Sequence, residues 1–329
     1  MHTISRRGFC VGAGRLAACA ATPVLARAMG IEPSPQWKSW FKVGVISDEI
    51  SQDFDHACYV ISKEFGLKWV ELREIWGKSM QVSTDAELSQ AEAILAKYNL
   101  GVTDIGSPLF KADWPGAPLS KHSPDYATHR APDKDLKEQD AVLAKSIELA
   151  IRFKTDKVRC FDFWRLENPA PYRAAMDDKL REAAGVAGKS GILLVLENEA
   201  GCNTATGREA ARTLAAAPSP HLALNWDAGN AIMAGEIDAF PGGWNALPKD
   251  RVHHCHVKNA VKNGTAKAEW SPVDIGIIDW PAQFRAMNRA GYRDALSLET
   301  HWHGGGTPEQ STRTSWAGME KCLDAAVVA

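Results

Sequence analysis

The sequence predicts a single (β/α)8 TIM barrel, and three observations support this fold class. Eight short apolar runs alternate with amphipathic, alanine-rich stretches, which is the pattern of a parallel α/β fold. Most of the runs are largely apolar, as expected for strands that are buried on both faces. Four runs end on a carboxylate or imidazole residue, where barrel enzymes place their active sites. The predicted strands are residues 42–46, 68–72, 101–105, 156–160, 191–196, 221–226, 252–257 and 294–299.

Helices are expected between these strands. The clearest amphipathic stretches are Asp85 to Tyr98, Leu136 to Phe153, Tyr172 to Gly188 and Gly207 to Ala217. The chain has no close internal repeat and no low-complexity linker, so residues 41–329 are predicted to form one barrel domain. Two prolines and two tryptophans mark residues 29–40 as a short lead-in segment, which we expect to cover the bottom of the barrel.

One long connection and several tryptophans indicate a substrate pocket. The connection from Gly106 to Asp133 is longer than the others and contains Trp114, while Trp164 falls just beyond a predicted strand. Long connections usually carry function, and aromatic rings suit the apolar faces of sugars. We expect the connection to cover a substrate that both tryptophans contact. The competing expectations are surface decoration for the connection and core packing for the tryptophans.

Four strand ends carry potential metal ligands. Glu197, Asp227, His256 and Glu299 each follow or end an apolar run, and strand ends converge at one face of a parallel barrel. Three carboxylates and one imidazole, without a thiolate, form a hard, oxygen-rich site. Mn2+ is therefore the first choice, with Co2+, Mg2+, Fe2+ and Zn2+ as alternatives. The competing expectation for each acidic residue is a helix cap or an ion pair.

The first 28 residues are predicted to be a twin-arginine export signal. Arg6 and Arg7 precede a modestly apolar stretch and a small-residue cleavage site that ends at Ala28. The export machinery carries folded proteins, so we expect a periplasmic protein that receives its metal in the cytoplasm. The segment ending at Cys19 also resembles a lipobox, which would leave a lipid anchor at Cys19. A basic surface tail is the remaining alternative.

Composition excludes several classes of protein. The formal net charge is −2, which argues against nucleic acid as a partner. No apolar run approaches the roughly 20 residues of a membrane-spanning helix. The 7 cysteines are scattered and give no disulfide framework. These features predict a globular protein that acts on a small molecule, and the sequence does not indicate its oligomeric state.

Several motifs resemble those of the sugar phosphate isomerase/epimerase family with the xylose isomerase-like TIM barrel. They cover residues 40 to 325, and their order and strand-end placement carry the resemblance. The resemblance implies a divalent ion held by Glu197, Asp227, His256 and Glu299, with the two glutamates doubling as acid and base. It also favours Glu197 over Glu199 as the ligand from that strand. The motifs are Val43–Val45, Val70–Arg73, Val195–Glu199, Asn225–Asn230, His254–Lys258, Gly276–Trp280 and Leu296–Glu299.

The chain departs from the family pattern at two places. Many relatives have a histidine three residues after the metal-binding aspartate, where this chain has Asn230. An arginine shortly before the Gly276 motif is also missing, since residues 270–276 read Trp-Ser-Pro-Val-Asp-Ile-Gly. Loss of the arginine weakens the case for a phosphorylated substrate. We therefore expect a non-phosphorylated sugar, an oxidised sugar or a glycoside.

The family chemistry implies proton transfer next to a carbonyl, through an enediolate. Glu197 and Glu299 would exchange the proton with the substrate carbon, and Lys258 could stabilise the oxyanion. His254 shares the strand parity of His256 and could line the site. We expect the remaining predicted substrate-binding residues, Glu71, Arg73 and Asn230, to contact substrate hydroxyls, with structural ion pairs as the alternative for the charged ones.

Three other functions compete with an isomerase or epimerase. The same proton abstraction applied to a 3-keto-glycoside would expel the aglycone, which is lyase or hydratase chemistry. An exported sugar-binding protein would keep the fold without catalysis, but the complete ligand set argues against it. A nuclease of the endonuclease IV type is disfavoured by the near-neutral charge and by the lack of a multi-histidine cluster.

Overall fold

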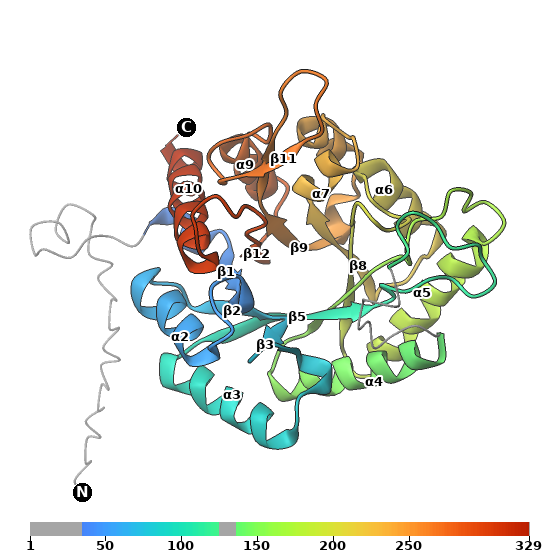
Figure 1. Cartoon of the computed structure of the whole chain (residues 1–329), viewed down its shortest axis with the longest axis horizontal. Helices are drawn as coiled ribbons and strands as arrows, with labels where there is room; N and C mark the ends of the chain where they lie inside the picture. The colour runs from blue at the N-terminus through green and yellow to red at the C-terminus, as the bar shows by residue number, and fades with distance from the viewer. Residues whose placement is uncertain (1–34, 125–135, 329) are drawn as a thin grey trace, which may run out of the picture. The chain divides into compact units, whose positions relative to one another are not determined.

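A closed barrel of eight parallel strands forms the centre of the protein (Figure 1). The structure is a computed structural model that describes residues 35–124 and 136–328. Each barrel strand pairs in parallel with its two neighbours, in the order β1-β12-β9-β8-β7-β6-β5-β2, and β2 closes onto β1. This confirms the predicted fold class. The barrel strands are β1 (Lys42–Ile46), β2 (Trp69–Leu72), β5 (Gly101–Leu109), β6 (Lys157–Cys160), β7 (Leu193–Glu197), β8 (Leu222–Asp227), β9 (Val252–Val257) and β12 (Ala295–Leu298).

Helices surround the barrel in the positions expected for a (β/α)8 fold (Figure 1). Two of them begin with a capping box, in which Thr84 pairs with Glu87 and Thr206 pairs with Glu209. Such boxes satisfy the free N–H groups of the first helical turn and fix where the helix begins. The helices are α2 (Phe54–Tyr59), α3 (Asp85–Tyr98), α4 (Leu136–Arg152), α5 (Arg173–Gly188), α6 (Gly207–Ala216), α7 (Ala228–Met233), α8 (Trp244–Ala246), α9 (Trp280–Arg289) and α10 (Pro308–Val328), with short 3-10 and π segments between elements.

The register between neighbouring strands arranges the polar side chains inside the barrel in layers. In β9, His254 and His256 are both fully buried and lie two residues apart, so they share one face of the strand. Asn225 of β8 is in register with His254, and Asp227 is in register with His256. Asp227 and His256 therefore occupy an upper layer near the strand ends, while Asn225 and His254 occupy the layer below.

Two short antiparallel hairpins extend the carboxyl ends of β2 and β9. The first pairs β3 (Glu74–Ile75) with β4 (Lys78–Ser79), and the second pairs β10 (Asn259–Val261) with β11 (Glu269–Ser271). Neither hairpin was predicted, because two- and three-residue strands leave no detectable period in the sequence. The second hairpin brings Trp270 over the candidate site.

The predicted long connection after residue 105 is shorter than expected. Strand β5 continues to Leu109, and a register irregularity between Ile105 and Leu109 accommodates Pro108. The first part of the predicted lid is therefore strand. Residues 125–135 lie outside the described part of the chain, as do the predicted export signal and Cys19.

The described part of the lead-in packs against α10. Its 3-10 helix, Gln36–Ser39, buries Trp37 to 1% exposure. Trp37 Nε1 donates a hydrogen bond of 2.8 Å to Asp324, and its ring packs edge-on against Trp316 at 6.4 Å between centroids. The lead-in thus fixes the last helix of the barrel.

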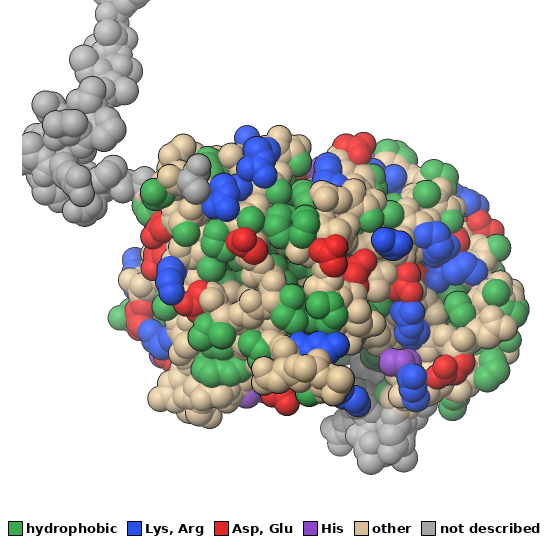
Figure 2. Space-filling view, turned by 90° about the horizontal axis from the view of Figure 1, so that it is seen from above, with side chains coloured by type: hydrophobic (Ala, Val, Ile, Leu, Met, Phe, Trp, Pro, Cys, Tyr) green, Lys and Arg blue, Asp and Glu red, His purple; other side chains and the backbone are tan. Residues whose placement is uncertain are grey.

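Charge is spread evenly over the face shown in Figure 2, where acidic and basic side chains lie near one another. This distribution gives no broad basic area for a polyanion on that face. Among the described helices, none combines the length and apolar character needed to cross a membrane.

Replacing Trp37 with alanine should destabilise the barrel by about 3–5 kcal/mol, because a large buried ring and its hydrogen bond are lost. Urea unfolding followed by circular dichroism measures this change. Trp37→Phe is the matched control and should recover most of the loss, since it keeps an aromatic ring. Equal stabilities for the alanine variant and the wild type would show that the lead-in does not support the fold.

Candidate functional site

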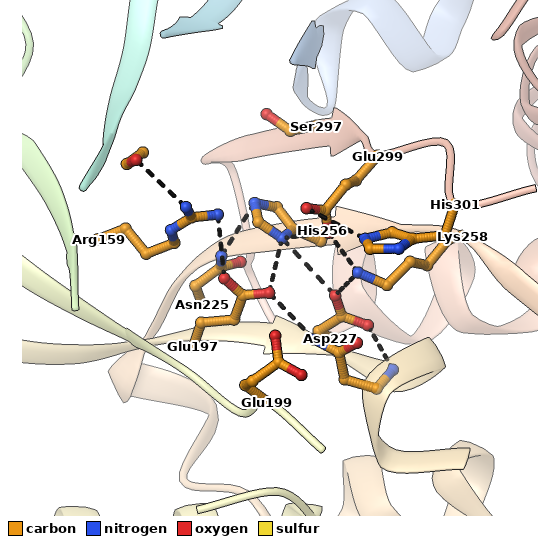
Figure 3. Close-up of polar contacts among 12 residues, drawn as sticks. Arg159, Glu197, Glu199, Asn225, Asp227, His256, Lys258, Ser297, Glu299 and His301 are labelled. Atoms are coloured by element: carbon orange, nitrogen blue, oxygen red, sulfur yellow. Dashed lines mark hydrogen bonds and ion pairs between the residues drawn. The ribbon is translucent and has the colours of Figure 1, made fainter. Parts of the chain in front are cut away.

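Four buried side chains meet at the carboxyl ends of the barrel strands (Figure 3). Glu197 ends β7, Asp227 ends β8, His256 lies in β9 and Glu299 follows β12. One ligand atom from each residue lies within 4.8 Å of the others, and the exposed fraction of every residue is 3% or less. The structure therefore brings together the four residues that the sequence proposed as metal ligands.

His256 lies at the centre of this group. Its Nδ1 atom is 3.2 Å from Glu197 Oε1, 3.1 Å from Glu299 Oε2 and 3.6 Å from Asp227 Oδ2. Burial lowers the pKa of the imidazole, but the surrounding carboxylates, led by Glu71, raise it well above its ordinary value. Nδ1 thus faces a strongly negative pocket. In Figure 3, Glu197 and Glu299 approach His256 from different sides.

Cations keep the two glutamates ionised. Burial raises the pKa of Glu197, but His256 and then Arg159, whose Nη1 lies 3.2 Å from Glu197, lower it overall. Burial likewise raises the pKa of Glu299, while Lys258 and His256 lower it well below the ordinary value. Both carboxylates are therefore able to accept a proton or to bind a cation.

The donor set fits a hard divalent cation. The ammonium group of Lys258 contacts both Asp227 and Glu299. Glu197 Oε2 and Asp227 Oδ2 are buried and accept no hydrogen bond, although each has a cation nearby. Carboxylate oxygen atoms that face one another and an imidazole nitrogen are the ligands that suit Mn2+ or Mg2+.

Asn230 supports two of these residues. Its backbone N–H donates to Asp227 Oδ1 over 2.7 Å, which makes Asp227 the N-cap of α7. Its side-chain amide donates to Glu197 Oε1 over 3.0 Å. The residue that replaces the family's histidine therefore orients Glu197 and Asp227.

Glu71 and His254 lie inside the barrel, behind His256. Glu71 is fully buried, and its two oxygens are 3.3 and 3.2 Å from His256 Nε2. Burial lowers the pKa of His254 to about 4. Burial raises the pKa of Glu71, but His256 and His254 lower it to about 2. Both residues are as fully buried as His256, and their contact with a substrate stays a prediction.

Arg73 lies at the rim and binds three carboxylates. Its guanidinium contacts Asp48 at 2.7 Å, Glu49 at 2.6 Å and Glu299 at 2.9 Å. This is the ion-pair alternative considered for Arg73. The contact with Arg73 nevertheless also orients Glu299.

The two predicted substrate-binding tryptophans contact other side chains of the protein. Trp114 packs edge-on against Phe163 at 4.8 Å between ring centroids, which is a packing role. The ammonium group of Lys111 lies over the ring of Trp164, 5.5 Å from the ring centre. Lys111 in turn pairs with Glu199 at 3.0 Å. Glu199, the alternative ligand, is therefore engaged with Lys111 and is outside the four-residue group.

Three residues at the site were missed by the sequence analysis. Arg159 lay inside the predicted strand 156–160, which also contains Asp156 and Lys157, so its charge alone did not single it out. His301 is two residues beyond Glu299, with its Nε2 3.4 Å from Glu299 Oε1. Trp270 packs on His301 at 4.9 Å between centroids and lies 5.5 Å from the Lys258 ammonium. No sequence signal placed Trp270, because its position depends on the unpredicted hairpin.

Solved structures with this fold cover nearly the whole barrel. A probable 3-DHS dehydratase from Bacillus anthracis is 17% identical with a TM-score of 0.62, and the match covers 85% of this chain and 97% of that chain. A xylose isomerase-like TIM barrel protein from Mycobacterium smegmatis in complex with magnesium is 14% identical with a TM-score of 0.61, covering 88% and 98%. The 3-keto-D-glucoside 4-epimerase from E. coli is 16% identical with a TM-score of 0.59, covering 86% and 100%.

Sequence comparison assigns the family. No curated protein sequence matches the chain. The sequence profile of the family described as "Xylose isomerase-like TIM barrel" matches residues 61–322, which includes all four candidate ligands. The protein therefore belongs to the xylose isomerase-like TIM barrel family.

Proposed function

We propose that the protein is a divalent-metal-dependent sugar isomerase or epimerase that acts on a non-phosphorylated sugar or keto-sugar. The observation that carries this proposal is the buried group of Glu197, Asp227, His256 and Glu299, with its ligand atoms within 4.8 Å of one another. Two glutamates in this group lie on different sides of His256, which suits proton transfer on two faces of one carbon. The E. coli structure with this fold is an epimerase of a keto-sugar, which agrees with the proposal.

The chain's residues divide the chemistry between them. Asp227 and His256 would mainly hold the ion, and Glu197 and Glu299 would complete its ligand set. A bound divalent ion would polarise a substrate carbonyl and so acidify the neighbouring C–H. One glutamate would remove that proton and the other would return a proton. Lys258, held between two of the carboxylates, would place a positive charge beside the developing oxyanion.

Charge pairing supports a non-phosphorylated substrate. Arg73 binds Asp48, Glu49 and Glu299, while Arg159 binds Glu197. The two site lysines are also paired with carboxylates. Within residues 35–124 and 136–328, each of these cations is thus already neutralised, which leaves none of them to bind a dianionic phosphate.

Export remains part of the proposal. A twin-arginine signal over residues 1–28 would deliver the folded barrel to the periplasm, where sugars and glycosides without phosphate are available. Mn2+ remains the proposed ion. A fold relative that was solved with magnesium agrees with a hard divalent ion in this fold.

Adding Mn2+ to the metal-free protein should raise its unfolding free energy by about 2.7 kcal/mol at 100 times the dissociation constant, because the ion binds the folded state. Thermal unfolding with and without the ion measures this shift. His256→Ala removes a ligand and should abolish it. A shift of equal size in both proteins would place the ion elsewhere.

Glu299→Gln should lower turnover by at least about 100-fold, because the amide cannot exchange the substrate proton. The assay follows Mn2+-loaded protein by NMR in D2O with free ketoses and 3-keto-glycosides. We expect deuterium at a carbon next to the carbonyl and a rearranged sugar. His303→Gln, a change at a residue beyond the site strand, is the control and should retain activity.

Other outcomes of the same assay distinguish the alternatives. Aglycone release that disappears in Glu299→Gln would identify a lyase that uses the same glutamate. Metal binding without any exchange or product would favour a sugar-binding protein.

A further inference from the structure

We propose that Glu71 is a positioning residue of the candidate metal centre, which accepts the Nε2–H of His256 and so turns the Nδ1 lone pair toward the ligand carboxylates. The inference rests on the proposed function, because it concerns the same metal site. It gives a specific role to Glu71, a fully buried carboxylate next to His256.

The two nitrogens of His256 face different partners. Nδ1 faces Glu197, Asp227 and Glu299, and Nε2 faces Glu71 at 3.2 and 3.3 Å. A neutral imidazole has one lone pair and one N–H. If Nδ1 supplies the lone pair to an ion, the proton must be on Nε2, where Glu71 is the anionic acceptor. Metal-binding histidines generally donate their second N–H to such an acceptor.

The neighbouring amide is compatible with this proton position. The side chain of Asn225 lies between the two rings, with its Nδ2 3.1 Å from His256 Nε2 and its Oδ1 3.1 Å from His254 Nδ1. An Nε2–H on His256 therefore requires the amide to be turned over, so that its oxygen faces His256 and its nitrogen faces His254; every donor then meets an acceptor. His254 then carries its proton on Nε2, which is 3.5 Å from Glu71 Oε2. The carboxylate of Glu71 therefore faces the Nε2–H groups of both imidazoles.

His256 needs a neighbouring group that fixes which of its two nitrogens carries the proton. His256 is reached by carboxylates on both of its nitrogens, so either nitrogen could hold the proton. Glu71 is fully buried and belongs to β2, which is separated from β9 by β1 and β12 around the barrel. A carboxylate in that position stabilises the tautomer with Nε2–H and also restrains ring rotation.

Glu71→Gln tests the proposal, because glutamine keeps the size of the side chain and removes its charge. Isothermal titration of the metal-free full chain with Mn2+ should show affinity reduced 10- to 100-fold. Asp104→Asn is the matched control. Asp104 is also a fully buried carboxylate, on the adjacent strand β5, but neither of its oxygens has a hydrogen-bond partner. This variant should bind Mn2+ within twofold of the wild type.

The outcomes separate this inference from the proposed function. Wild-type affinity in Glu71→Gln would overturn the role of Glu71 while leaving the metal site intact. Equal losses in both variants would also overturn it, because they would reflect any polar substitution inside the barrel and not the contact of Glu71 with His256. A wild-type protein that binds no Mn2+ would overturn the proposed function and this inference together.

A second measurement covers the case in which Glu71→Gln does not fold. Nitrogen-15 NMR of Zn2+-loaded wild-type protein with labelled histidine reports which ring nitrogen is protonated. The His256 signals are assigned by their loss in His256→Gln. We expect Nε2 to be protonated and Nδ1 to have the shift of a metal-bound nitrogen. The reverse pattern would contradict the proposal.

Discussion

The site depends on one constraint, which is that several carboxylates are buried close together inside the barrel. Glu71, Glu197, Asp227 and Glu299 are all nearly fully buried, and isolated buried charges are strongly destabilising. Arg159, Lys258 and, at the rim, Arg73 pair with Glu197, Asp227 and Glu299, and the carboxylates raise the pKa of His256 well above its ordinary value. A divalent cation bound at His256 would take the place of an imidazole proton in balancing this charge. The affinity for a cation and the stability of the barrel are therefore linked through the same residues.

Much of the fold was predictable from local sequence. Strands buried on both faces read as continuous apolar runs, and the predicted bounds agree with those of β1, β7, β8 and β9 to within two residues. The four candidate ligands followed from the same reasoning, because the ends of parallel strands converge at one face. Predicting that these residues meet required no knowledge of long-range contacts beyond the closure of the barrel.

The rest of the site depends on how deep each residue lies in the barrel and on contacts between segments that are far apart in the sequence. Strand parity placed His254 on the same face as His256, but it could not show that His254 and Glu71 lie behind His256. Arg73 lies at the rim because three carboxylates from separate segments surround it. Trp270 reaches the site only through a hairpin of three-residue strands. These positions are set by the register between strands and by the path of the loops.

The two oxygens of Asp227 perform different tasks. Oδ1 accepts the backbone N–H of Asn230 at the start of α7, and Oδ2 faces Lys258 and His256. Glutamate would keep the charge but, with one more methylene, could not hold both positions at once. The first turn of α7 and the polar centre thus share a single side chain, so disorder at one would spread to the other. Any change in what Asp227 Oδ2 binds would therefore act directly on the start of α7, which follows β8 without a loop.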